Sequence, residues 1–160
     1  MTAIHVPTRA EVSPANQALF DQLAKGLGQV PNLYATLALS EHALGSYLAL
    51  QNAKSSITGK AREVVNLVVS QVNGCAYCLA AHTVIGGMVG FTPEQILEIR
   101  RGRAGWDAKL DALARMVHGI ARERGRAEPA RLEAFFAAGW TQANLVDAIV
   151  TIGDKTITNY

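Results

Sequence analysis

The two cysteines of the chain, Cys75 and Cys78, lie three positions apart, and His82 follows the second by four positions. A helix that begins at Cys75 places these side chains on one face. The free backbone amides and the positive dipole end at such a helix N-terminus favour a thiolate and lower the thiol pKa. The spacing therefore predicts a thiol redox site whose cysteine pair opens and closes a disulfide.

A carboxylate upstream, Glu63, can join this site if the chain reverses at Asn73-Gly74. The flanking helices then pack antiparallel, with His82 about 12 Å and Glu63 about 16 Å from the turn. An offset of about 4 Å is within reach of a Glu side chain. We therefore expect Glu63 to orient and charge His82, and His82 to act as the base for Cys78.

This arrangement gives the two sulfurs different roles. Cys78, which is nearer to the base, is the expected attacking thiolate. Cys75 is expected to resolve the resulting sulfenic acid by closing the disulfide. Loss of Glu63 or His82 should then slow the first oxidation without abolishing the disulfide.

Proline and glycine positions predict a helical chain. Four of the five prolines sit where helices start, and none lies inside a periodic apolar run. The helix that begins at Cys75 is expected to fade at Gly86-Gly87, before Gly90. The sequence thus predicts an all-α fold with helices over residues 14–27, 31–39, 40–54, 59–73, 75–90, 93–101, 107–124, 129–138 and 142–160.

Two segments of the chain share one layout. Residues 60–92 and 109–141 match at a constant offset of 49 positions, and both end in Gly-aromatic-Thr. This pattern predicts an internally duplicated helical unit, of which only the first copy carries reactive side chains. At the positions that match Glu63, Cys75, Cys78 and His82, the second copy has Ala112, Arg124, Ala127 and Arg131.

Length and composition bound the class of protein. With 160 residues, 49% hydrophobic and 6% aromatic, we expect a single domain over residues 1–160 with an aliphatic core. A net charge of +2 does not indicate nucleic-acid binding, and no apolar run reaches the roughly 18 residues of a membrane span. The first twelve residues carry polar and charged side chains throughout, so we expect no secretory segment there. We therefore expect a cytoplasmic protein, in which a Cys-x-x-Cys pair indicates redox or metal chemistry before a structural disulfide.

Three other interpretations of the cysteine pair stay open. A thioredoxin-type motif would make residues 64–69 a strand, although the chain lacks the alternating strands of that fold. Zinc could be held by the two cysteines with His82 and Glu63, but no second pair of ligands is present, and we expect neither metal nor cofactor. The cysteines could also be packed, reduced, in a core. A c-type haem is excluded because Leu79, not histidine, follows the second cysteine.

The segment NGCAYCLAAHT, residues 73–83, with Glu63 upstream, resembles the AhpD-like alkylhydroperoxidases of the carboxymuconolactone decarboxylase superfamily. The resemblance covers residues 57–100 well and the rest only in helical layout. It implies an AhpD-like helical domain, a homo-oligomer (a trimer, or a hexamer of paired units) and a dithiol peroxidase without cofactor. In that family the second cysteine attacks, the first resolves, and a Glu and a His relay protons. These roles fall on Cys78, Cys75, Glu63 and His82.

The resemblance thus implies reduction of hydroperoxides at the expense of an external thiol or dithiol reductant. Tyr77 departs from the family, because its best-studied peroxidases have a histidine just before the second cysteine, and this predicts an altered rate or peroxide preference. Two alternatives stay open. One is decarboxylase-type acid–base chemistry on a lactone or carboxylic acid by Glu63 and His82. The other is a thiol redox sensor without enzymatic activity.

Overall fold

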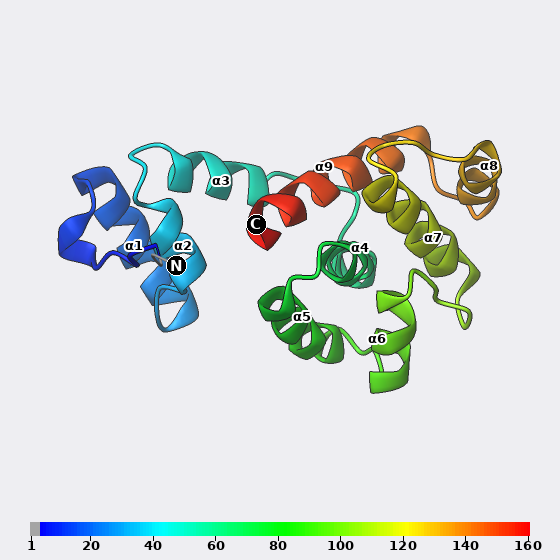
Figure 1. Ribbon diagram of the computed structural model, residues 1–160, viewed down its shortest axis with the longest axis horizontal. Coiled ribbons are helices and arrows are strands. Elements are labelled where there is room, and N and C mark those ends of the chain that lie inside the picture. The colour runs from blue at the N-terminus through cyan, green and yellow to red at the C-terminus, as the bar shows by residue number, and fades with distance from the viewer. Residues whose placement is uncertain (1–3) are drawn as a thin grey trace. The chain divides into compact units, whose positions relative to one another are not determined.

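The computed structural model describes residues 4–160, and over these residues the chain forms nine α-helices and no strand (Figure 1). The all-α prediction is confirmed. The thioredoxin-type interpretation is wrong, because residues 64–69 lie within a helix rather than a strand. None of the described helices combines the length and apolar content that a membrane crossing requires. The chain divides into two compact units, one ending at Lys54 and the other spanning Ser55–Tyr160. The single domain over residues 1–160 stays a prediction.

The first unit contains a short 3-10 helix, Arg9–Glu11, followed by α1 (Pro14–Leu27), α2 (Asn32–Leu37) and α3 (Ala43–Gln51). Helix α1 begins as predicted, because the Ser13 side chain accepts a hydrogen bond from the Asn16 amide. The buried Asn16 side chain in turn donates to the carbonyl oxygens of Ala38 and Ser40, at 3.0 Å each, and ties α1 to the segment after α2. The small hydrophobic core of the first unit consists of Val12, Phe20, Ala35, Ala38 and Leu44.

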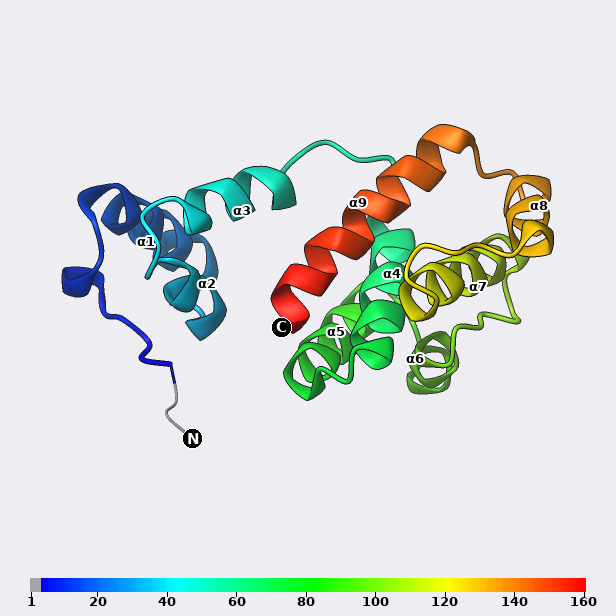
Figure 2. The same ribbon diagram turned by 45° about the horizontal axis from the view of Figure 1, so that its top comes forward.

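The second unit is built around α4 (Gly59–Val72). This helix packs against α5 (Ala76–Met88), α6 (Pro93–Arg100), α7 (Ala108–Arg122) and α9 (Gln142–Asn159), while α8 (Pro129–Ala137) packs on α7 (Figures 1 and 2). Every residue from Glu63 to Ser70 is buried, so α4 is enclosed on all sides. A helix in this position can present different side chains to several neighbours at once.

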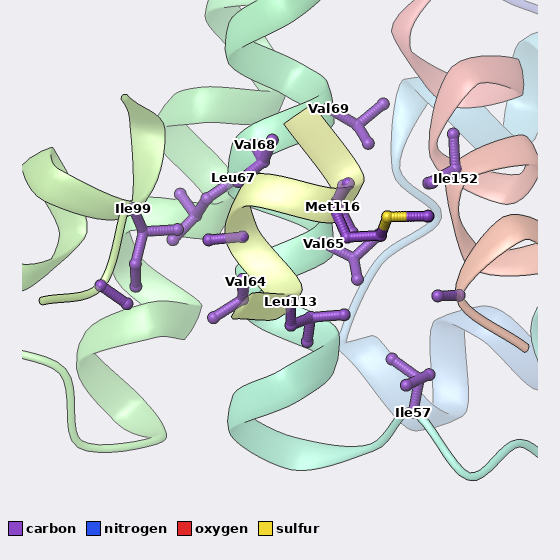
Figure 3. Close-up of a cluster of buried hydrophobic side chains, with 14 of the residues drawn as sticks. Ile57, Val64, Val65, Leu67, Val68, Val69, Ile99, Leu113, Met116 and Ile152 are labelled. Carbon is purple, nitrogen blue, oxygen red and sulfur yellow. The ribbon is translucent and has the colours of Figure 1, made fainter. Parts of the chain in front are cut away.

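The core of the second unit is aliphatic, as the composition predicts. Val64, Val65, Leu67 and Val68 of α4 are fully buried, and Leu113 of α7 packs into the same cluster (Figure 3). Stacking of the aromatic rings of Phe135 and Trp140, with centroids 5.7 Å apart, extends this core toward α8.

Helix boundaries follow the predictions closely. Helix α5 ends at Met88, within the stretch from Gly86 to Gly90 where the sequence predicts that it fades. A Cβ atom at Gly86 would lie 3.3 Å from the Ile96 side chain. The glycine therefore permits close packing of α6 on α5 rather than ending the helix.

The internal duplication stays a prediction. Helices α4 and α7 begin at the predicted offset, as do α6 and α9, and Thr92 and Thr141 each form a capping box. The middle helices do not keep the offset, because α5 begins at Ala76 and α8 at Pro129.

The buried core predicts a clear contrast between two leucines. Leu113→Ala removes a fully buried side chain and should lower the free energy of unfolding by about 3 to 5 kcal/mol. Leu97→Ala, at a position that is 49% exposed, should lower it by less than about 1 kcal/mol. Urea unfolding followed by circular dichroism measures both values. Equal losses would contradict this description of the core.

Candidate active site

The turn between α4 and α5 positions the first cysteine, Cys75, at the start of α5. Gly74 has φ 68°, in the left-handed region that favours glycine. The Cys75 amide donates to the Ser70 carbonyl oxygen (3.0 Å), and the Gly74 amide donates to that of Gln71 (3.2 Å). These two bonds form a Schellman motif, which ends α4 and reverses the chain. Cys75 follows directly as the N-cap of α5.

The two sulfur atoms lie next to each other at this helix start. Both cysteines are free thiols, and their Sγ atoms are 2.6 Å apart. Sγ of Cys75 also accepts a hydrogen bond from the Cys78 amide (3.4 Å). Cys75 is partly exposed and Cys78 is only 5% exposed, while Tyr77 between them is 66% exposed. The two thiols are therefore close enough to each other to form a disulfide within the first turn of α5.

The environment of Cys78 corrects one expectation from the sequence. Burial raises the pKa of the Cys78 thiol, and its hydrogen bond with Cys75 adds to this effect. The predicted lowering of the thiol pKa at the helix N-terminus is therefore wrong for Cys78. The free helix amide points to Cys75, whereas Sγ of Cys78 faces the Thr158 carbonyl oxygen at 3.5 Å, an acceptor that favours the protonated thiol.

Glu63 and His82 meet as the sequence predicts. Oε2 of Glu63 lies 2.7 Å from Nδ1 of His82, and both side chains are buried. The other oxygen, Oε1, accepts a hydrogen bond from Nδ2 of Asn66 (2.7 Å). With the carboxylate as the acceptor, a neutral imidazole carries its proton on Nδ1 and has Nε2 as its acceptor.

A lysine from α9 contacts Nε2, the second ring nitrogen of His82. Nζ of Lys155 lies 2.8 Å from Nε2 of His82, and Lys155 is 8% exposed. Burial lowers the pKa of the Lys155 ammonium, against the raising effects of Asp154, Cys78 and Glu63. The result is a buried chain of hydrogen bonds from Lys155 through His82 to Glu63.

Helix α4 has a polar face toward these hydrogen-bonded side chains. Glu63, Asn66 and Ser70 are spaced by three and four residues and share one side of an otherwise apolar buried helix. Ser70 accepts a hydrogen bond from Nδ2 of Asn159 (3.2 Å), whose Oδ1 accepts one from Asn73 (2.9 Å). These contacts fix the last turn of α9 beside the cysteines.

The structure thus brings the four predicted residues into two contacting pairs, Cys75 with Cys78 and Glu63 with His82. In the described part of the chain, Nε2 of His82 contacts Lys155 rather than Cys78. Sequence reasoning missed Lys155, although a signal existed. Asp147, Asp154 and Lys155 are the only charged residues in 142–160, so a cation deep in that helix indicates a buried partner.

The residues of the site are not arranged as a metal centre. Among residues 4–160, no group of three or more His, Cys, Asp or Glu side chains is arranged to hold a metal ion. One imidazole nitrogen of His82 bonds Glu63 and the other bonds Lys155, which leaves neither for a metal.

Solved structures share this fold over nearly the whole chain. An uncharacterized peroxidase-related protein from Silicibacter sp. TM1040 is 25% identical, with a TM-score of 0.79, over 99% of this chain and 90% of that one. The alkylhydroperoxidase AhpD core of a peroxidase-related protein from Ralstonia eutropha JMP134 is 20% identical, with a TM-score of 0.84, over 99% and 88%. The debrominase Bmp8 is 13% identical, with a TM-score of 0.78, over 99% and 87%. A cysteine-to-alanine variant of it was solved with 2,3,4-tribromopyrrole.

Family membership comes from the sequence comparison. A search of curated proteins gives no significant match. The sequence model of the carboxymuconolactone decarboxylase family matches residues 39–118, which is half of the chain and includes both cysteines, Glu63 and His82. The fold of this chain is that of the AhpD-like structures. The chain therefore belongs to the carboxymuconolactone decarboxylase family.

Proposed function

We propose that this protein is a dithiol peroxidase that reduces hydroperoxides at Cys78 and Cys75. The observation that carries the proposal is the pair of free, adjacent sulfurs next to a buried Glu63–His82 pair. An isolated buried thiol needs none of these neighbours. A thiol that must lose a proton and pass it to a leaving oxygen needs both a base and a second sulfur.

The chemistry balances with these residues alone and an external reductant. The Cys78 thiolate attacks one oxygen of the hydroperoxide, the O–O bond breaks, and the alkoxide takes up a proton to leave as an alcohol. Cys78 is then a sulfenic acid. The Cys75 sulfur attacks it, water leaves, and the Cys75–Cys78 disulfide forms. A thiol or dithiol reductant returns both cysteines to thiols by exchange.

We propose a location and an oligomeric state along with this function. The reaction needs a compartment in which the pair is re-reduced, which favours the cytoplasm. We also propose a homo-oligomer, since exposed apolar residues on α9 such as Val146, Ile149 and Ile157 offer surface for subunit contacts.

Each of the two alternatives from the sequence leaves some of the four site residues without a role. Decarboxylase-type acid–base chemistry would use the buried Glu63–His82 pair, as the family name implies, but would leave the sulfur pair without a role. A redox sensor would use the sulfurs but not the buried acid and imidazole.

The fold shared with debrominase Bmp8 supports a second candidate reaction at the same sulfurs. A dithiol can remove bromine from an aromatic ring: the ring gains hydrogen, bromide leaves, and the two thiols become a disulfide. This reaction and peroxide reduction give the same oxidised protein. They differ in whether an alcohol or bromide is released.

Serine variants of the two cysteines separate these functions. Cys78→Ser should lose reductant-dependent consumption of cumene hydroperoxide and of hydrogen peroxide. Cys75→Ser should still form one sulfenic acid per chain when no reductant is present, and with reductant it should turn over only as fast as the reductant itself reduces that acid, because the internal resolving step is missing. Dimedone labelling with mass spectrometry detects the sulfenic acid, and dithiothreitol serves as the reductant.

The controls distinguish the rival roles. Turnover of hydroperoxide by Cys78→Ser at the wild-type rate would overturn the assignment of the attacking sulfur. Absence of turnover with either peroxide, together with bromide release from tribromopyrrole, would replace the peroxidase by the dehalogenase. A change in oligomer size on oxidation without any turnover would favour the sensor.

The buried acid and imidazole should control the first oxidation. Glu63→Gln and His82→Ala should slow sulfenic acid formation about 10²-fold, because proton transfer loses its partner. The disulfide should still form, since Cys75 is untouched. Glu133→Gln, which changes an exposed carboxylate, serves as the control. Stopped-flow thiol oxidation measures these rates, and an unchanged rate in both site variants would remove the relay from the mechanism.

A further inference from the structure

Lys155 occupies the nitrogen of His82 through which the predicted mechanism would take the Cys78 proton. Nδ1 of His82 bonds the Glu63 carboxylate at 2.7 Å, and Nε2 bonds Nζ of Lys155 at 2.8 Å. A neutral imidazole has one donor nitrogen and one acceptor nitrogen, and both are in use. In this arrangement His82 has no lone pair left for the Cys78 proton.

We propose that Lys155, held by His82 and Glu63, is the ionisation partner of Cys78: its amine takes the thiol proton, and its ammonium stabilises the thiolate. This inference rests on the proposed function, because Cys78 is the sulfur it serves. It changes the roles of the other two residues. Glu63 orients His82, and His82 positions Lys155.

The geometry of α9 supports this role. Lys155 and Thr158 are three residues apart on one face of the helix, and the Thr158 carbonyl oxygen contacts Sγ of Cys78. The hydrogen bonds of Asn159 to Ser70 and Asn73 hold the same turn of α9. The side of α9 that carries Lys155 is therefore fixed against the cysteine helix.

The charged groups around Lys155 favour transfer of a proton between Cys78 and Lys155. Helix α4 contributes Glu63 and Arg62, α5 contributes Cys78 and His82, and α9 contributes Asp154, which pairs with Arg62 at 3.1 Å. Burial lowers the pKa of Lys155 and raises that of Cys78, so it shifts each group toward its neutral form. Lys155 in turn acts to lower the pKa of Cys78. The thiol–amine and thiolate–ammonium pairs are thereby brought closer in free energy.

The proton step then closes within the site. The proton leaves Sγ of Cys78 for the Lys155 amine and gives a thiolate–ammonium pair. The thiolate attacks the hydroperoxide, the O–O bond breaks, and the departing alkoxide takes the proton from the ammonium. Lys155 is again an amine and Cys78 is a sulfenic acid.

Alkylation of Cys78 by iodoacetamide tests this role without peroxide. Measurements start from Cys75→Ser, in which Cys78 is the single thiol, and compare it with Cys75→Ser/Lys155→Met over pH 6 to 11. Loss of the cation should raise the apparent thiol pKa by about one unit or more. A rise of one unit leaves about tenfold less thiolate at neutral pH, and each thiolate reacts about threefold faster.

The two pH profiles should therefore differ at neutral pH and converge as the pH rises. The Lys155→Met variant is expected to react about threefold more slowly at pH 7, and the difference should disappear toward pH 11, where Lys155 of the parent is a neutral amine and no longer stabilises the thiolate. Cys75→Ser/Lys109→Met, which removes a lysine that lies over the Trp140 ring, should follow the parent curve. Superposed profiles, or a uniform loss of rate without a shift, would overturn the role of Lys155. Neither result depends on peroxide turnover, so the peroxidase proposal is tested separately.

Nitrogen NMR of the His82 imidazole in the wild-type protein gives a second test, which does not use the Lys155→Met variant. The proposal requires neutral His82 with its proton on Nδ1 and an accepting Nε2 at pH 7. Detection of that tautomer supports it. An imidazolium, or the Nε2–H tautomer, would overturn it even if Lys155→Met failed to fold.

Discussion

A buried carboxylate and a buried amine share a single imidazole in this protein, and the second unit is organised to satisfy all three. Glu63 accepts from Asn66 and His82, and His82 accepts from Lys155. A buried polar group left without its hydrogen-bond partner typically costs about 1 to 3 kcal/mol, and a charged group costs more. Helices α4, α5 and α9 must therefore stay in fixed register for the fold to tolerate these groups at all.

That register is also what the sulfur chemistry requires. The Schellman turn at Gly74 sets Cys75 at the start of α5, and one helical turn brings Cys78 beside it. The end of α9 closes this region from the other side through Thr158 and Asn159. The reactive pair is thus formed by a local turn, whereas its electrostatic environment comes from a helix more than 70 residues later in the chain.

The local part of this arrangement could be predicted from the sequence. Proline positions gave the helix starts, and the rise of a helix brought Glu63 to the level of His82 across the turn at Asn73-Gly74. Long-range contacts could not be predicted in the same way. The position of Lys155 depends on how α9 packs on α4, and single-sequence periodicity does not specify which helices pack together. The direction of the Cys78 pKa was mispredicted for a related reason, since burial of the side chain raises it and local spacing does not show how deeply a side chain is buried.

In the proposed reaction, one hydroperoxide converts the two thiols into one disulfide. Intact-mass measurement of the reduced wild-type protein after one equivalent of cumene hydroperoxide, with the alcohol product quantified, tests it directly. We expect a loss of about 2 Da per chain, assigned to a Cys75–Cys78 bond, and one alcohol per chain. A stable gain of about 16 Da without loss of both thiols, or alcohol formation without any change in protein mass, would contradict it.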